Sequence, residues 1–375
     1  MRIALVHDDF VQAGGAESLF VTIASIWPDA PIYTSLVDWK KLPVTIDRNR
    51  VRPSFIQKIP FATKLYKLLL PLYPLAFESF NFDDFDLVIS STTRFAKSVI
   101  TKPKTIHICY LNSLPRFLWG RQVQKNYLKS PVVFLVRPFL IWLKRWDIVA
   151  SSRVDFYIAN SENVAKKIKK IYSRRSDVIH PFADTQFFRP AKIHNWELKS
   201  QNYFLVVTRL VKWKKIEIAI KAACNLGINL KIVGEGPDRS RLKGLVRDDK
   251  AGDIEFLGRV TREQLREHYQ NCQALIITQE EDFGIAAVEA QACCRSVIAY
   301  AYGGQREIVR EGKTGLFFDS QNAQSLQDAI KAFFRVKWSV SACRENALRF
   351  SKEKFIRELE RYVSQVSEVS EVLRA

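Results

Sequence analysis

Short apolar runs alternate along this chain with longer segments in which apolar residues recur at helical spacing. The runs comprise residues 3–6, 87–89, 105–110, 178–180, 203–208, 230–233, 254–257, 274–277 and 297–300. Runs of this length between polar or glycine-rich turns are typical of buried strands, and the segments between them favour helices. Strand, helix and strand in that order form a βαβ unit, so the pattern predicts parallel sheets in an α/β protein.

The clearest unit spans residues 273–307. A strand at 274–277 is followed by a polar turn at 278–282, a helix expected to begin near Gly284, and a second strand at 297–300. The loop after the first strand then lies at the carboxyl edge of the sheet. Because open α/β sheets bind ligands at that edge, we expect a site here.

Two carboxylates, Glu281 and Glu289, bracket the start of this helix with seven residues between them. Backbone N–H groups of Phe283, Gly284 and Ile285 lack intrahelical partners and can bind an anion. A carboxylate accepts hydrogen bonds from both hydroxyls of a vicinal diol. The pattern therefore favours a ligand with phosphate between two sugars, a nucleotide-sugar. The alternative is a helix cap at Glu281 and a solvated Glu289.

The net charge of +19 favours an anionic partner, such as nucleic acid, acidic lipid or a phosphorylated substrate. Six cysteines and five histidines show no metal-ligand spacing, so we expect reduced thiols in a cytosolic protein. The segment 84–86 has the form D-x-D but leads directly into a strand, so we interpret it as a strand boundary. The first residues enter a strand at once, which predicts no signal peptide, and no apolar run is long enough to span a bilayer.

The segment E-D-F-G-I-A-A-V-E, residues 281–289, resembles the E-x7-E signature of glycosyltransferase family 4. Residues 303–309 and 311–315 match the usual continuation of that signature. The resemblance implies retaining transfer on a GT-B fold, with Glu289 holding the ribose of the nucleotide and Glu281 the transferred sugar. Cys294 and Ser296 depart from the family, which usually has Gly and Pro there.

Further matches in the second half imply donor contacts. Arg209 and Lys214 fit the family's R-x4-K pair, which would carry the leaving diphosphate; surface ion pairing is the alternative. Gly234 and Gly236 fit its G-x-G-P turn beneath the donor, and Val260 lies in the loop expected beside the nucleobase.

Matches in the first half imply further donor contacts at Gly14 and Gly15 and acceptor-side contacts at Asn112 and Arg116. Gly14 and Gly15 follow the first strand and precede a helix, so they form either a phosphate cradle facing the donor or only a turn. Asn112 stands where the family commonly has a histidine, and Asn cannot take a proton near neutral pH. Arg116, four residues later, is either a phosphate contact or a surface ion pair.

Two stretches, residues 56–77 and 131–149, mix Lys and Arg with Leu, Phe, Trp and Tyr and contain prolines. This composition is typical of segments that lie at a membrane interface, although core helices would also explain it. With the surplus positive charge, it favours contact with an anionic membrane surface.

We therefore expect a GT-B fold: two facing Rossmann-like domains, 1–185 for the acceptor and 186–350 for the nucleotide-sugar, and a helix at 351–375 crossing back to the first. The expected enzyme is a metal-independent retaining hexosyltransferase without a cofactor. The chain as a whole resembles bacterial mannosyltransferases that use GDP-mannose in polysaccharide synthesis. This resemblance implies GDP-mannose as donor and a lipid-linked glycan as acceptor, at the inner face of the cell membrane. The alternatives are a basic nucleic-acid-binding protein, for which no recognition motif is present, and a non-catalytic family member.

Overall fold

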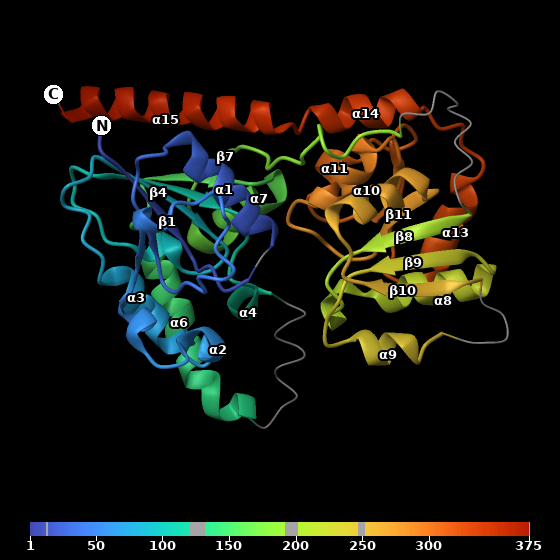
Figure 1. The fold of residues 1–375 in the computed structure, drawn as a ribbon, viewed down its shortest axis with the longest axis horizontal. Helices are drawn as coiled ribbons and strands as arrows, with labels where there is room; N and C mark the ends of the chain where they lie inside the picture. Colours follow the sequence, from blue (N-terminus) through green and yellow to red (C-terminus); the bar gives the residue numbers. More distant parts are fainter. Residues whose placement is uncertain (13, 121–131, 192–201, 247–251, 375) are drawn as a thin grey trace. The chain divides into compact units, whose positions relative to one another are not determined.

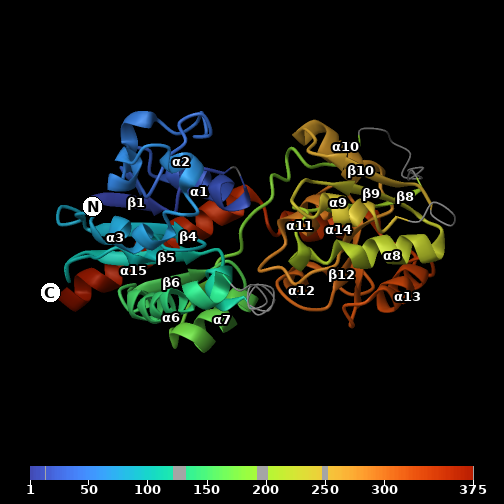
Figure 2. The same ribbon diagram turned by 90° about the horizontal axis from the view of Figure 1, so that it is seen from below.

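The computed structural model describes residues 1–12, 14–120, 132–191, 202–246 and 252–374. Contacts divide the chain into unit 1, Met1–His180 with Phe355–Ala375, and unit 2, Pro181–Lys354. Each unit contains a sheet whose described strands pair in parallel, with helices around it (Figures 1 and 2). The prediction of two Rossmann-like domains with parallel sheets is confirmed.

Unit 1 has a seven-stranded sheet in the order β3-β2-β1-β4-β5-β6-β7. The strands are β1 (Ile3–His7), β2 (Ile32–Thr34), β3 (Val51–Pro53), β4 (Leu87–Thr92), β5 (Ile106–Leu111), β6 (Phe156–Ala159) and β7 (Asp177–Val178). The chain runs outward from β1 through β2 to β3 and then returns to place β4 on the other side of β1. The strand order therefore reverses between β1 and β4, whose residues pair from Ile3 with Leu87 to His7 with Ser91.

Unit 2 repeats this plan in a six-stranded sheet of order β10-β9-β8-β11-β12-β13. The strands are β8 (Tyr203–Val207), β9 (Asn229–Val233), β10 (Ile254–Gly258), β11 (Ala274–Ile277), β12 (Ser296–Tyr300) and β13 (Gly315–Phe318). The order reverses between β8 and β11. A ligand site in an open α/β sheet is expected at such a reversal, outside the carboxyl ends of the two strands.

Helices and short 3-10 turns connect the strands. In unit 1 the α-helices are α1 (Gly15–Ile26), α2 (Ala62–Leu65), α3 (Tyr73–Glu78), α4 (Arg116–Trp119), α6 (Val132–Ser151) and α7 (Glu162–Tyr172). In unit 2 they are α8 (Ile216–Leu226), α9 (Arg239–Lys243), α10 (Arg262–Asn271), α11 (Ile285–Ala292), α12 (Gln305–Ile308), α13 (Ala323–Phe333) and α14 (Val340–Leu348). Ser161 caps α7 by accepting a hydrogen bond from Val164 N, because a hydroxyl satisfies a backbone donor that the first turn leaves free.

The last helix, α15 (Lys352–Arg374), begins in unit 2 and belongs to unit 1 from Phe355 onward. The Phe355 ring packs edge-on against Tyr110 of β5 with 5.8 Å between centroids. Farther along, the Tyr362 hydroxyl donates to Asp177 at 2.9 Å. Through these contacts α15 packs against the sheet of unit 1 (Figure 1).

Residues 181–200, with prolines and little periodicity, predict an interdomain linker, and the structure differs from this prediction. The described part, 181–191, belongs to unit 2, where Ala183 and Phe188 are buried in the core. Ala183 N also donates to Phe350 O at 3.1 Å. The prolines and weak periodicity suggested a linker, but two aromatic side chains, Phe187 and Phe188, anchor the segment to unit 2. The rest of the expected linker, residues 192–200, lies outside the described residues.

Helix α6 joins the core of unit 1 through a fully buried ion pair. Lys97 Nζ lies 2.5 Å from Asp147 Oδ1, and both side chains have no exposed surface. Asp147 also accepts hydrogen bonds from Trp119 Nε1 at 2.8 Å and the Tyr172 hydroxyl at 2.7 Å, while Lys97 donates to Arg94 O at 3.0 Å. One carboxylate thus connects α6, α4, α7 and the loop after β4.

We expect Lys97→Met to destabilise unit 1, because it leaves Asp147 as a buried charge without a counter-ion. Removing one partner of a buried pair typically costs about 3–5 kcal/mol in the free energy of unfolding. The matched control is Glu255→Gln, which removes an exposed pair with Lys231 and should change stability by less than about 1 kcal/mol. Urea unfolding curves of the purified variants measure both, and equal losses would contradict the importance assigned to Asp147.

Candidate functional site

The loop between β11 and α11 lies at the carboxyl edge of the unit 2 sheet, at the reversal of strand order. It runs from Thr278 to Gly284, and α11 begins at Ile285, as the sequence predicted. Gly284 has φ +110°, a left-handed conformation that glycine adopts without strain. This turn directs the first N–H groups of α11 toward the edge where β8 also ends.

Glu281 is held by two donors in this loop region. Lys214 Nζ makes an ion pair with Glu281 Oε1, and the Gln279 amide donates to the same oxygen at 2.5 Å. Lys214 is 9% exposed, and its ammonium group lies over the Trp213 ring at 4.3 Å from the centroid. The structure therefore brings together two predicted site residues, one following β8 and one following β11.

Gln305 fixes the position of this loop, a role that the sequence analysis missed. Its fully buried amide accepts from Glu281 N at 3.1 Å and donates to Gln279 O and Tyr300 O, both at 2.9 Å. Gly303 and Gly304 precede it and lie against the backbone of residues 281–283, so close that a Cβ would approach Glu281 O to 2.4 Å or Asp282 O to 2.3 Å. The G-G-Q sequence was visible, but only the fold shows what it contacts.

Arg209 lies directly beyond β8, with an exposed side chain. The two glycines predicted to lie beneath the donor, Gly234 and Gly236, pack against the backbone on either side of it. A Cβ would come within 1.9 Å of Thr208 O at the first and 2.1 Å of Leu210 O at the second. Their structural effect is thus to let the segment after β9 support the loop that carries Arg209.

Glu289 lies on the second turn of α11 with a half-buried side chain. The fully buried Tyr269 of α10 donates its hydroxyl to Glu289 Oε2 at 2.9 Å. Burial raises the pKa of Glu289 to about 7, although the Tyr269 hydrogen bond opposes that shift. Tyr269 was not identified from the sequence, because a single Tyr in an amphipathic helix resembles an ordinary core residue.

The remaining residues of unit 2 that were singled out from the sequence differ in position and burial. Phe283 is buried, and its ring packs against Phe350 with 5.5 Å between centroids, so its side chain is part of the core of unit 2. Ile285 is the first residue of α11, and Val260 is partly buried beyond β10. Cys294 adopts φ +64° where the family usually has Gly, which explains that family preference, and Ser296 starts β12.

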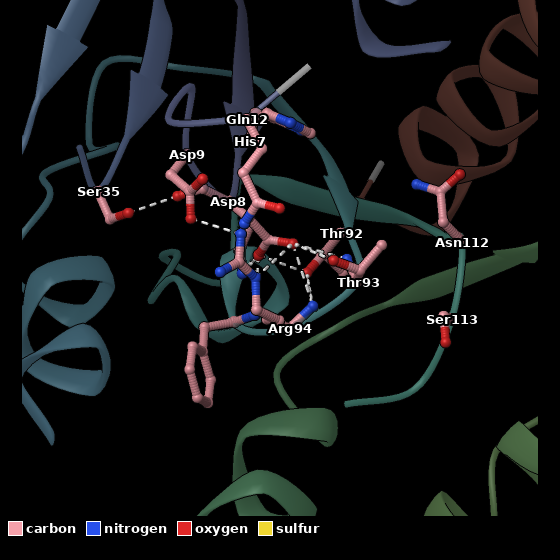
Figure 3. Close-up of polar contacts among 12 residues, drawn as sticks. His7, Asp8, Asp9, Gln12, Ser35, Thr92, Thr93, Arg94, Asn112 and Ser113 are labelled. Carbon is pink, nitrogen blue, oxygen red and sulfur yellow. Dashed lines mark hydrogen bonds and ion pairs between the residues drawn. The ribbon is translucent and has the colours of Figure 1, made fainter. Parts of the chain in front are cut away.

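A polar network occupies the equivalent edge of unit 1, where β1 and β4 end (Figure 3). The buried Asp8 carboxylate accepts hydrogen bonds from the backbone N–H groups of Thr93, Phe95 and Ala96 at 2.7–2.9 Å, and from the Thr92 hydroxyl at 2.7 Å. Burial would raise the pKa of Asp8, but Arg94, His7 and these backbone groups outweigh it and hold the pKa at about 2. Asp8 therefore closes the loop after β4.

Asp9 lies beside it and pairs with the Arg94 guanidinium (Figure 3). Burial raises the pKa of Asp9, while Arg94 opposes that rise. His7, the last residue of β1, is also buried, which lowers its pKa to about 4 and leaves the ring neutral. Asp8 and Asp9 were not identified as site residues from the sequence, although two consecutive acids directly after the first strand were a visible signal.

The predicted residues of unit 1 lie at the start of α1 and in the segment that follows β5. Gly14 is the N-cap of α1 in an extended conformation, and Gly15 is the first residue of that helix. Asn112 follows β5 and donates its amide to the Ser91 hydroxyl at 3.1 Å. Arg116 begins α4 and is partly buried.

Among the described residues, no group of three or more His, Cys, Asp and Glu side chains is arranged to hold a metal ion. All six cysteines are buried free thiols. In the described part of the chain, no helix has the length and apolar character needed to cross a bilayer.

Comparison with known proteins agrees with this geometry. Residues 189–350 match the family model described as "Glycosyl transferases group 1". An uncharacterized glycosyltransferase of Methanocaldococcus jannaschii is 32% identical over 153 residues, 40% of this chain and 44% of the relative. D-inositol 3-phosphate glycosyltransferase of Mycobacterium tuberculosis is 30% identical over 199 residues, 48% of this chain and 41% of the relative. The chain thus matches less than half the length of these relatives.

Solved structures resemble the whole chain. Sucrose-phosphate synthase from Thermosynechococcus elongatus aligns with a TM-score of 0.74 and 20% identity over 98% of this chain and 99% of its own. Anabaena HepE, in complex with UDP, aligns with a TM-score of 0.69 and 19% identity over 97% of this chain and 100% of its own. The fold is therefore that of the GT-B structures, and the match to the glycosyl transferases group 1 model lies within unit 2.

The raised pKa of Glu289 predicts a pH dependence of stability. Because its pKa is about 7 in the folded chain and 4.5 ordinarily, the folded state retains the proton. This contribution to stability is present below pH 4.5 and is lost as the pH rises through about 7. We expect the melting temperature of Glu289→Gln to fall less between pH 6 and 8 than that of the wild type, by a few degrees.

The control is Glu345→Gln, at an exposed position on α14, which should follow the wild type. Glu17 remains in all three proteins, and burial raises its pKa to about 7 as well. The melting temperature of every protein should therefore still fall somewhat as the pH rises. Differential scanning fluorimetry across the pH series measures these curves. Parallel curves for Glu289→Gln and the wild type would contradict the prediction.

Proposed function

We propose that this protein transfers a hexose from a nucleotide-sugar to a hydroxyl group, with retention of anomeric configuration. The observation that carries the proposal is the Lys214–Glu281 pair at the reversal of strand order in unit 2, next to the start of α11. The glycosyl transferases group 1 match over residues 189–350 supports the same reaction class. UDP bound to HepE, a neighbour in fold, is consistent with a nucleotide donor.

Arg209 and Lys214 are the groups that would receive the leaving diphosphate. Both follow β8, and Lys214 is nearly buried, so its charge is weakly screened by water. Fixed cations stabilise the negative charge that grows on the diphosphate as the glycosidic bond breaks. The N–H groups of Phe283, Gly284 and Ile285 would bind the same diphosphate. Because these two cations would take the place of a metal at the diphosphate, we propose a metal-independent reaction without a cofactor.

The two carboxylates would bind the sugars on either side of the diphosphate. Glu281, held by Lys214 and Gln279, would accept hydrogen bonds from hydroxyls of the transferred hexose. Glu289 would accept from the ribose, with Tyr269 restraining its carboxylate. Ribose binding favours the ionised form of Glu289, because a carboxylate accepts from two hydroxyls and a carboxylic acid gives up one of those positions.

GDP-mannose is the proposed donor, on overall sequence similarity to mannosyltransferases, and a lipid-linked glycan is the proposed acceptor. UDP-glucose is the competing donor, since HepE has also been solved with it. Thermal-shift measurements against UDP-, GDP- and ADP-sugars separate these choices. The nucleotide-sugar that raises the melting temperature most identifies the base and the sugar.

We expect Arg209→Ala and Glu289→Ala to lower turnover about a hundredfold or more while the chain stays folded, because each removes a contact to a charge or a hydroxyl that must be held during transfer. Gln279→Leu should reduce turnover about tenfold or more through loss of a hydrogen bond to a charged group. The assay measures release of nucleoside diphosphate, with EDTA present throughout.

Lys212→Ala is the matched control, since this exposed cation lies on the same turn as Lys214. It should retain near-normal turnover. Turnover of Arg209→Ala as high as that of Lys212→Ala would contradict the proposed role of the cation pair. Full loss of wild-type turnover in EDTA, restored by a divalent metal, would contradict metal independence.

We also propose that unit 1 docks reversibly on an anionic membrane, at the inner face of the cell membrane, where a lipid-linked acceptor would be found. The stretch 56–77 forms 3-10 turns with α2 and α3, and the described part of 131–149 lies in α6. Both contribute to one core cluster of unit 1, so each is partly core. Their outer sides nevertheless expose large apolar groups, namely Phe61, Leu65, Leu68, Leu75, Ile141, Trp142, Ile148 and Val149.

Basic side chains accompany these apolar groups. Lys64 lies over the Phe61 ring at 5.8 Å, and Lys67 over Tyr66 at 5.7 Å. Exposed Arg137 and partly exposed Lys144 extend the charge along α6. Each cation near an acidic membrane contributes about 1 kcal/mol, so a handful suffices for docking without insertion.

We expect the protein to co-sediment with acidic vesicles and not with neutral ones, and to dissociate as salt increases, because screening shortens the reach of the charges. Replacing Lys64, Lys67, Arg137 and Lys144 by Gln should abolish sedimentation. The control replaces Lys166, Lys167, Lys169 and Lys170 of α7, which removes as many charges from the same unit without touching the apolar surface. Equal binding to both vesicle types, or equal loss in both variants, would contradict the proposal.

A further inference from the structure

The carboxyl edge of the unit 1 sheet contains polar groups beyond those that close the loop after β4. We propose that Glu17, Tyr73 and Arg94 at this edge form a subsite for a hydroxyl-rich sugar that is uncharged or carries an amine, and that the subsite discriminates against phosphorylated sugars. The proposal rests on the proposed function, because the sugar would be part of the acceptor. It assigns to the acceptor side residues other than Asn112 and Arg116.

The position of these groups follows from the topology. Asp9 comes after β1 and Arg94 after β4, the two strands between which the strand order reverses. Figure 3 shows Asp8 and Asp9 converging with Arg94 at this point. The same reversal in unit 2 lies beside Lys214 and Glu281. An open parallel sheet therefore offers a ligand position here as well.

The network has more acid than base. Asp8, Asp9 and the half-buried Glu17 are near one guanidinium, that of Arg94, which pairs with Asp9 and lies 4.0 Å from Asp8. The neighbouring Lys97 is committed to Asp147, and His7 is neutral. An added phosphate would meet carboxylates that outnumber the one guanidinium, whereas a hydroxyl or an ammonium group would find acceptors.

A buried hydroxyl without a partner supports a ligand at this position. Tyr73 is 1% exposed, and its hydroxyl makes no hydrogen bond within the described chain. Its ring packs against Phe95, the residue after Arg94, with 5.9 Å between centroids. Burial and then the charge of Asp9 raise the pKa of Tyr73, so the hydroxyl stays protonated beside Asp9 and Arg94. The nearby Ser35 hydroxyl donates to Asp8 O at 2.5 Å.

A sugar hydroxyl suits these groups because it can both donate and accept a hydrogen bond. It could accept from Arg94 or Tyr73 and donate to Glu17, and vicinal hydroxyls could do both together. Glu17 and Arg94 remain partly exposed and would make the first contacts. Tyr73 would complete the site from the buried side.

The experiment is saturation-transfer NMR of the full chain with methyl α-D-glucopyranoside, glucosamine and glucose 6-phosphate. UDP and GDP are added in excess to occupy the proposed donor site. We expect the first two sugars to bind the wild type and glucose 6-phosphate to bind much more weakly. Tyr73→Phe should weaken the binding of methyl α-D-glucopyranoside about two- to tenfold, as expected for one hydrogen bond. Glu17→Gln should weaken it at least as much.

Glu162→Gln is the control, an exposed acid in the first turn of α7. Tyr73→Phe removes a hydroxyl without a partner, so its melting temperature should match the wild type. Unchanged affinity in both variants, no signal from methyl glucoside and glucosamine, or equal binding of glucose 6-phosphate would overturn the proposal. Donor turnover and nucleotide thermal shifts are measured separately, so loss of those alone counts against the proposed function and not against this subsite.

Discussion

One topological constraint underlies both halves of this protein: a parallel sheet whose strand order reverses leaves the carboxyl ends of two neighbouring strands side by side, with their loops diverging. In unit 1 the strands are β1 and β4, and in unit 2 they are β8 and β11. Groups distant in sequence meet at these points, such as Asp8 with Thr93 and Lys214 with Glu281. The polar chemistry of the chain is concentrated there because the strands themselves are apolar and buried.

The two reversals are stabilised differently. In unit 1 a single carboxylate, Asp8, satisfies successive backbone N–H groups of the loop after β4, which would otherwise be buried without partners. In unit 2 an amide, that of Gln305, connects the loop to neighbouring backbone, and two glycines permit the close approach. Unit 2 has a largely buried ion pair, Lys214 with Glu281, in this loop region. Unit 1 instead buries its Asp9 and leaves Arg94 partly exposed.

Sequence patterns predicted the fold well because apolar runs and helical periodicity depend on local physics. Strand 274–277 and a helix beginning beside Gly284 follow from hydrophobic spacing and from a residue that tolerates φ +110°. The linker prediction at 181–200 was wrong in its described part, since Phe188 is buried in unit 2. Proline and low periodicity describe a segment without regular structure, and such a segment can still be anchored by individual aromatic side chains.

The sequence by itself determined the α/β class, the parallel sheets and the placement of Glu281, Glu289, Arg209 and Lys214 at strand or helix ends, because these depend on residue order within short segments. The tertiary structure decided which of these groups touch. Gln279 and Gln305 around Glu281, Tyr269 on Glu289 and Arg94 on Asp9 are contacts between side chains whose meeting depends on sheet order and helix packing. The pKa of Glu289 near 7 was likewise decided there, because burial is a property of the packed chain and not of the residue.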